Sequence, residues 1–218
     1  MRDSSAHTRR LLGLQRAQRA CTRCVDAGHI PRAHPVFSGH AGQRILLVGQ
    51  APGPVEIDQS RPFAGRAGRQ LMRWLMRAGF RDEDDVRDRI YMTAMTTCFP
   101  GRRPDGAGDR RPSAAEVALC APWLDAVIAL VLPRLIIPIG SLALERFLPG
   151  RRLDEVIGSA YTSGGSTCSG FPREDPVLLP LPHPSGQSRW LNDPARAALL
   201  DRAILRLGSL ISWADAGR

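Results

Sequence analysis

The residues best suited to chemistry follow a sharp turn at residues 49–53, Gly-Gln-Ala-Pro-Gly. Two glycines and a proline so close together neither extend a strand nor start a helix, so the backbone has to turn there. The next segment carries Glu56, Asp58, Arg61 and Phe63. These residues supply carboxylates, a guanidinium and an aromatic face, enough to hold and act on a flat polar ligand. An ordinary strand-to-helix turn is the alternative.

The elements that must position these residues alternate along the chain. Strand-like apolar runs cover 45–48, 90–97, 135–139 and 177–181, and helical patterns cover 65–79, 113–132, 141–147 and 193–213. A capping box at Ser113 and Glu116 and a capping carboxylate at Asp193, just before a proline, mark two of the helix starts. This alternation predicts an α/β fold, a three-layer α/β/α sandwich around a central four-stranded parallel sheet. The turn at 49–53 follows the first strand, at the sheet edge where open α/β sheets bind their ligands.

Length favours one domain, because 218 residues bury a substantial core without dividing. We expect a basic helix within an N-terminal segment, 1–43, that packs on a core of residues 44–213. Two stretches lie outside the alternation. Residues 100–112 predict a basic loop, and the Gly- and Ser-rich residues 150–176 predict an exposed, mobile one.

Four of the five cysteines have a spacing that suits a metal site. Cys21 and Cys24 form a CxxC pair, Cys98 follows the second strand, and Cys120 lies in the helix over 113–132. A close pair and two distant cysteines can converge on one four-thiolate site, which suits an iron–sulfur cluster or structural zinc. An incidental CxxC with two buried thiols is the alternative. Cys168 has no assigned role.

The charge of the chain favours a polyanionic partner. Its formal net charge is +9 and its pI is near 10.7, which is typical of nucleic-acid-binding proteins. All thirty basic residues are arginine, which suits phosphate contacts, although a GC-rich coding bias explains the same preference. No lysine is present to form a Schiff base. Lacking a run of about 18 apolar residues or a signal-peptide core, the protein is expected to be cytoplasmic, away from membranes.

Together these elements resemble the family 4 uracil-DNA glycosylases, the iron–sulfur branch of their superfamily, over nearly the whole chain. Residues 49–68, GQAPGPVEIDQSRPFAGRAG, match the family's first motif without a gap. Residues 91–100, YMTAMTTCFP, resemble the second motif, and residues 183–185 are its third motif, HPS. The resemblance implies a [4Fe–4S] cluster on the four cysteines in order: Cys21, Cys24, Cys98 and Cys120.

The resemblance also implies roles for the motif residues. Phe63 matches the aromatic that stacks on a flipped-out base, and His183 matches the histidine that contacts the base near O2 at the scissile bond. Glu56 matches a carboxylate bordering the pocket. Gln50 replaces a family glutamate, and a glutamine there resembles family 1. Glu56 and Gln50 are therefore the two candidates for holding the attacking water.

Two positions depart from the expected pattern. Ala51 stands where family 1 enzymes carry a water-orienting aspartate, although family 4 also has a small residue there. Ala94 replaces the asparagine that reads the uracil edge, which resembles family 5 with its wider range of deaminated bases. We expect both alanines to border the base. The resemblance therefore specifies the reaction type better than the base.

The segment after His183 has the composition of a DNA-probing wedge. Trp190 or Leu191 would fill the gap left by a flipped base while Arg189 holds a phosphate; alternatively, Trp190 packs beneath the loop. Ser185 and Arg66, from the matched motifs, are further expected DNA contacts. The arginines of the basic loop either bind phosphates or only solvate the loop: Arg102, Arg103, Arg110 and Arg111.

These features predict a monomeric, monofunctional DNA glycosylase that hydrolyses the N-glycosidic bond of uracil, or of related deaminated bases, in base excision repair. The expected partner is DNA that contains such a base. One alternative is a catalytically silent iron–sulfur DNA-binding protein of the same fold, motivated by Ala51 and Ala94. A glycosylase that traps the sugar through a further histidine is a weaker alternative, because the other histidines all lie near the N-terminus.

Overall fold

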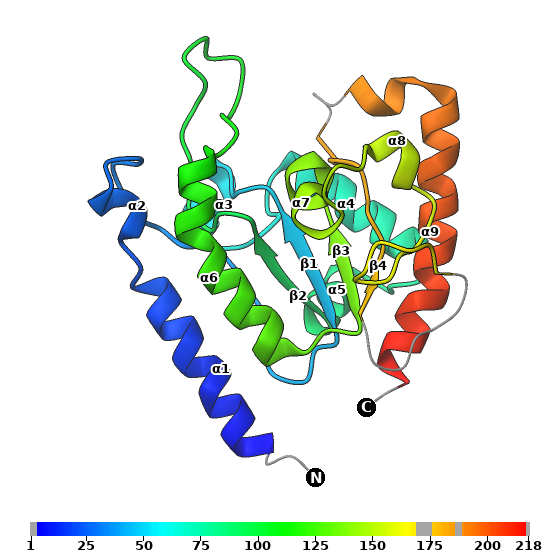
Figure 1. Ribbon diagram of the computed structural model, residues 1–218, viewed down its shortest axis with the longest axis horizontal. Helices are drawn as coiled ribbons and strands as arrows, with labels where there is room; N and C mark the ends of the chain where they lie inside the picture. The colour runs from blue at the N-terminus through cyan, green and yellow to red at the C-terminus, as the bar shows by residue number, and fades with distance from the viewer. Residues whose placement is uncertain (1–3, 169–175, 186–188, 217–218) are drawn as a thin grey trace.

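The computed structural model describes residues 4–168, 176–185 and 189–216 of the chain. Its centre is a parallel sheet of four strands in the order β2-β1-β3-β4 (Figure 1). The strands are β1 (Ile45–Gly49), β2 (Ile90–Ala94), β3 (Leu135–Pro138) and β4 (Val177–Leu178). The predicted α/β/α sandwich is confirmed.

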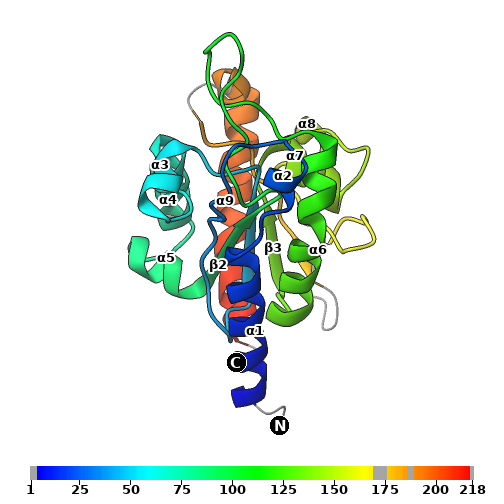
Figure 2. The same ribbon diagram turned by 90° about the vertical axis from the view of Figure 1, so that its left-hand side faces the viewer.

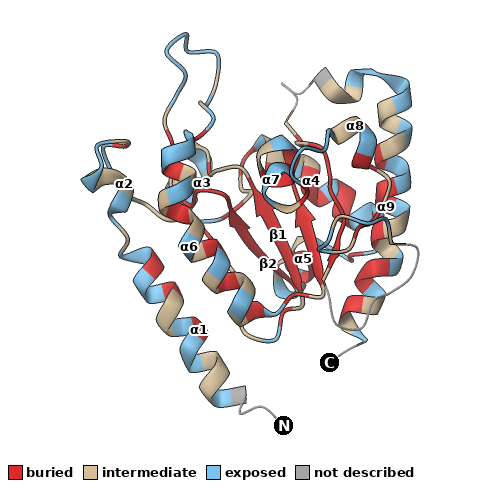
Figure 3. Cartoon of the chain, viewed as in Figure 1, coloured by how far each residue is buried: buried red, intermediate tan, exposed pale blue. Residues whose placement is uncertain are grey.

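Helices cover both faces of the sheet, as the turned view shows (Figure 2). Ile45 and Leu47 of β1 point into a core shared with α4 (Arg66–Arg77) and α9 (Pro194–Asp215). The alternate residues Leu46 and Val48 point into a second core with residues of α1, α6 and α7. Because both faces are covered, every strand residue is buried (Figure 3).

The helices on the second face include α1 (Ser4–Arg19), α6 (Ala114–Val131), α7 (Gly140–Phe147) and α8 (Leu153–Val156). Helix α6 begins at the predicted capping box, in which the Ser113 hydroxyl accepts from the Glu116 backbone N–H. Helix α9 likewise begins at the predicted cap, Asp193. Local capping chemistry therefore identified both helix starts from the sequence.

Several predicted bounds need correction. The strand predicted over 90–97 ends at Ala94, because Met95 and Thr96 turn to bond the backbone of the turn after β1. The predicted exposed loop at 150–176 is wrong for its first part, which contains α8 and the buried residues Val156 and Tyr161. Residues 169–175 of that stretch lie outside the described residues. Three short helices were not predicted: α2 (Arg23–Asp26), α3 (Pro54–Gln59) and α5 (Glu83–Arg89).

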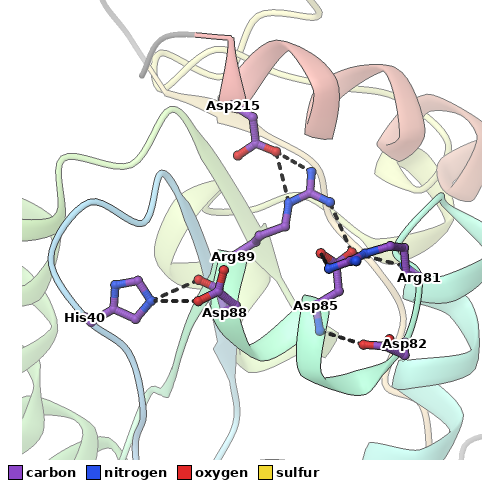
Figure 4. Close-up of polar contacts among 7 residues, drawn as sticks. All are labelled: His40, Arg81, Asp82, Asp85, Asp88, Arg89 and Asp215. Carbon is purple, nitrogen blue, oxygen red and sulfur yellow. Dashed lines mark hydrogen bonds and ion pairs between the residues drawn. The ribbon is translucent and has the colours of Figure 1, made fainter.

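Charged side chains fasten α5 to the end of α9 (Figure 4). The Arg89 Nε atom donates to Asp215 at 3.0 Å, and Arg89 also pairs with Asp85 at 3.3 Å. Asp85 accepts from the Arg81 backbone at 3.0 Å. Burial alone would raise the pKa of Asp85. The hydrogen bonds from Arg81 and the charges of Arg89 and Arg81 outweigh burial, so the pKa is lowered. Because Arg89 directly precedes β2, this network lies at the amino-terminal edge of the sheet, opposite the edge that carries the turn at residues 49–53.

Helix α6 is long and apolar enough to cross a membrane by length and composition alone. In the fold it lies against the sheet and α1, and its residues Cys120, Leu124 and Val127 are buried inside the protein. The helix also carries the charged residues Glu116 and Asp125. The face of α6 that carries Leu124 and Val127 packs on the second core, which accounts for part of its apolar character.

Candidate active site

The carboxyl ends of the strands open into a cavity of about 340 Å³. Gly49 ends β1 beside Ala94 at the end of β2, and Ile139 after β3 pairs with Leu181 just before His183. The predicted site residues that line this cavity are Gln50, Ala51, Glu56, Phe63, Ala94, His183 and Ser185. The volume is within the range of small-molecule sites, about 300–1,000 Å³.

The side chain of Glu56 joins the two halves of the first motif. Its Oε2 accepts from the backbone N–H of Gly53 at 3.1 Å, and its Oε1 accepts from the backbone N–H of Gly65 at 2.8 Å. Gly53 and Gly65 are the N-caps of α3 and α4, whose first N–H groups have no partner within their own helix. Glu56 therefore closes the loop between the two helices, in addition to bordering the cavity.

Phe63 lies in this closed loop with a left-handed backbone, φ 53°. Such a conformation is uncommon outside glycine and is found at functional sites that the surrounding structure enforces. A Cβ on Gly49 would lie 2.9 Å from the Phe63 ring, and one on Gly68 would lie 1.8 Å from the Phe63 carbonyl oxygen. Both glycines are therefore required by their close approach to Phe63. They explain why the motif is rich in glycine.

His183 enters the cavity after β4 as a neutral donor. Its Nδ1 accepts from the Ser185 backbone N–H at 3.2 Å, which places the ring proton on Nε2. Burial lowers the pKa of His183, so the neutral form is favoured. A Cβ on Gly140 would lie 3.3 Å from the His183 Cβ, and Gly140 has φ 78°. This close contact with Gly140 restricts the position of the His183 side chain in the cavity wall.

The part of the cavity that would read a base is sparse in polar side chains. Ala94 presents a methyl group at the end of β2, and it is buried. Gln50 lies opposite, where its backbone carbonyl accepts from the Thr96 N–H at 3.2 Å. Ala51 follows it in the wall. Of Ala94, Ala51 and Gln50, only Gln50 therefore carries a side-chain donor and acceptor.

Two wall residues, Asp109 and Arg110, come from the loop that projects between β2 and α6 (Figure 1). The sequence analysis missed Asp109 because its loop reads as basic. Partial burial raises the pKa of Asp109; Arg102 opposes the shift and the charge of Glu56 adds to it. Both terminal nitrogens of Arg110 donate to Glu116, at 2.6 and 2.7 Å, so Arg110 is held in the wall and its contact with phosphate stays a prediction.

The remaining expected contacts lie away from the cavity wall. Arg61 pairs with Glu83 of α5 at 2.6 Å, and Arg66 is exposed on the first turn of α4. Trp190 donates from Nε1 to Asp154 at 2.6 Å and, like Leu191, packs against the core. Arg189 begins the short 3-10 helix η1 (Arg189–Asn192). The preceding loop, 186–188, lies outside the described residues, so the wedge role stays a prediction.

The structure also brings four distant cysteines to one small cavity. Cys21, Cys24, Cys98 and Cys120 all line it, as does Thr96. The Thr96 hydroxyl is buried without a hydrogen-bond partner among the described residues. A buried unpaired hydroxyl is costly, so it indicates a polar group in the cavity. The four thiols and this hydroxyl fit a sulfur-bridged cofactor.

Hydrogen-bond donors face three of these thiols. The Trp123 Nε1–H donates to Cys21 Sγ at 3.3 Å, and the Thr97 hydroxyl lies 3.8 Å from Cys120 Sγ. Burial raises the pKa of Cys98 to about 12, while the His34 backbone opposes the shift. Within the described part of the chain, no group of three or more His, Cys, Asp or Glu side chains is arranged to hold a single metal ion.

Fold and cavity agree with the comparison to known families. The family model of the uracil DNA glycosylase superfamily matches residues 37–207, which span all four strands and all three cavity-forming motifs. The chain belongs to this superfamily. The family resemblance inferred from the motifs is thereby confirmed.

The similar curated proteins share one description. The chain is 34% identical over 134 residues to the type-4 uracil-DNA glycosylase of Thermotoga maritima, covering 61% of this chain and 63% of that protein. It is 34% identical over 146 residues to the type-4 enzyme of Pyrobaculum aerophilum, covering 65% and 68%. The match to the Thermotoga protein thus spans less than two thirds of its length.

The packing of Phe63 yields a direct test in Gly68→Ala. The added methyl would meet the Phe63 carbonyl, so the loop must shift, and we expect overpacking to lower the free energy of unfolding by about 1–3 kcal/mol. Chemical denaturation measures the change. Gly13→Ala in α1 is the control, because nothing lies within 4 Å of the added Cβ. Equal stability of Gly68→Ala and wild type would contradict this packing.

Proposed function

We propose that the protein is a monofunctional uracil-DNA glycosylase, which hydrolyses the N-glycosidic bond of uracil, and of related deaminated bases, in DNA. The observation that carries the proposal is the cavity that holds both the Phe63 ring and the neutral His183 donor at the carboxyl edge of the sheet. Membership of the superfamily and the names of the similar proteins support the same reaction.

Phe63 suits the capture of a flipped base. Extruding a base from a duplex costs a few kcal/mol, and stacking on an aromatic ring returns about 1–3 kcal/mol. The enforced backbone of Phe63 holds its ring against Gly49 before any ligand arrives. This preorganisation supports a role in which the ring orients the base plane rather than closing on it afterwards.

His183 suits the departing base. Cleavage leaves negative charge on the base, and a donor aimed at its O2 stabilises that charge as an oxyanion hole does. Because Nδ1 accepts from Ser185, Nε2 carries the proton to be donated. A neutral imidazole donates without first binding a solvent proton. Its lowered pKa therefore supports a donor that functions at neutral pH.

The four cysteines would hold a [4Fe–4S] cluster, with one thiolate for each iron: Cys21, Cys24, Cys98 and Cys120. When bound, this group would supply cross-linking between the N-terminal segment, the end of β2 and α6, rather than any step of the reaction. Glu116 borders the same cavity and holds Arg110 in the wall of the active site. The proposed cluster would thereby help to hold the loop over the base.

His183→Ala tests the proposed reaction. Loss of one charge-stabilising donor should lower the single-turnover rate of uracil release by roughly 10²–10³-fold, with little change in affinity for the DNA. Labelled uracil-containing oligonucleotides measure both quantities. His7→Ala on α1 is the matched control and should keep the wild-type rate. Wild-type protein that binds this DNA but releases no base would instead support the silent DNA-binding alternative.

The cofactor proposal predicts a brown protein with about four irons per chain. Cys98→Ser should lose the visible absorption and iron and should unfold at a lower temperature. Cys168→Ser is the control and should retain both, because Cys168 does not line the cysteine cavity. Metal analysis of protein purified without oxygen measures the outcome. Colourless wild-type protein with one zinc per chain would contradict the assignment.

Ala94 predicts a broad base range. A buried hydrogen-bonding side chain rejects a base that leaves it unpaired, whereas a methyl group does so weakly. We expect activity on hypoxanthine or xanthine besides uracil, and Ala94→Asn should narrow the range toward uracil. Single-turnover rates on a panel of modified oligonucleotides measure the preference. Strict uracil specificity in the wild type would mean that another residue reads the base edge.

A further inference from the structure

Two carboxylates from distant parts of the chain meet at Gly53 in the cavity wall. A Cβ on Gly53 would lie 3.0 Å from Glu56 Oε2 and 3.1 Å from Asp109 Oδ2. Gly53 has φ −96° and ψ −177°, an extended conformation that any residue adopts, so its backbone does not require glycine. The missing side chain instead lets two acceptor oxygens approach the Gly53 backbone closely.

The Asp109 carboxylate is therefore held beside Glu56 at the edge of the cavity. A water in the cavity would donate to the Asp109 oxygen at about 2.8 Å and keep a lone pair free for attack. Gly53, Glu56 and Asp109 all line that cavity together with Phe63 and His183.

The two carboxylates are not equivalent as bases. Both oxygens of Glu56 already accept backbone N–H groups, from Gly53 and Gly65. No hydrogen bond reaches the Asp109 carboxylate among the described residues, and partial burial raises its pKa, an effect that Arg102 opposes and Glu56 adds to. A less stabilised carboxylate takes a proton more readily. Asp109 is thus the better acceptor, and Glu56 the better fixed support.

On the basis of the proposed function, we propose that Asp109 is the general base of the hydrolysis and that Glu56 supports the wall beside it. The water oxygen bonds to C1′ of the deoxyribose as the bond from C1′ to the base nitrogen breaks. The electron pair of that bond leaves with the base, whose charge His183 stabilises. One water proton passes to Asp109, and the other stays on the new hydroxyl group.

Asp109→Asn tests this assignment in the full chain. The amide still fits but is a poor base, so the single-turnover rate of uracil release should fall by roughly 10²–10⁴-fold, with unchanged affinity for uracil-containing DNA. Asp105→Asn is the matched control in the same loop, because its carboxylate is exposed and bonds only to Arg103 and the Ala107 backbone among the described residues. It should keep the wild-type rate.

Gly53→Ala gives an independent test, because its methyl group would crowd the Asp109 oxygen at 3.1 Å and displace it without changing the charge. Its rate should also fall, and the double variant with Asp109→Asn should lose less than the two separate losses multiplied together, since both changes act through the same carboxylate. Melting temperatures of each variant exclude unfolding as the cause. Fully multiplicative losses would show that Gly53→Ala does not act through Asp109 and would overturn the assignment.

The outcomes separate this inference from the proposed function. If the wild type releases uracil and Asp109→Asn does so at the wild-type rate, Asp109 is not the base. If Asp109→Asn only weakens DNA binding, the residue merely shapes the loop and the inference also fails. If the wild type releases no base from any oligonucleotide of the panel, the proposed function itself is wrong.

Discussion

The active site depends on one carboxylate bonded to two backbone N–H groups. Glu56 ties the start of α3 to the start of α4, and the loop that it closes carries Phe63 in a left-handed conformation. Charge-assisted bonds of this kind are stronger than neutral ones. They offset the cost of the unfavourable backbone, which is of order 1–3 kcal/mol. The aromatic face is therefore in place because the loop holds it there, with Gly49 and Gly68 leaving room for it.

An ion pair between Arg110 and Glu116 joins this site to the cysteines. Arg110 in the cavity wall binds Glu116 with two hydrogen bonds, and Arg110 holds the pKa of Glu116 at about 2. Glu116 borders the cysteine cavity, while Arg110 adjoins Asp109 in the active-site wall. The loop between β2 and α6 thus spans both cavities. A group bound by the cysteines would stabilise the active site through this loop without touching the DNA base.

The sequence predicted what local patterns and motifs encode. Strand periodicity gave the sheet, capping residues gave the starts of α6 and α9, and the first motif located Phe63 and Glu56 at the cavity. The sequence alone could not predict side-chain contacts between residues that only the folded chain brings together. Asp109 looked like part of a basic loop, because only the fold brings its carboxylate to Gly53. The sequence left Trp190 open between a DNA wedge and packing beneath its loop, because its partner Asp154 lies in α8, within a stretch whose composition predicts an exposed loop.

The central claim is that this lysine-free chain removes a base by hydrolysis and leaves the DNA strand intact. Strand-cleaving glycosylases use an amine that forms a Schiff base with the abasic sugar, and no lysine supplies one here. The direct measurement is product analysis after incubation of the wild type with a uracil-containing oligonucleotide, with and without borohydride. We expect free uracil, a strand that breaks only after hot alkali, and no trapped protein–DNA adduct. A nicked strand without alkali, or a borohydride-dependent adduct, would contradict the claim.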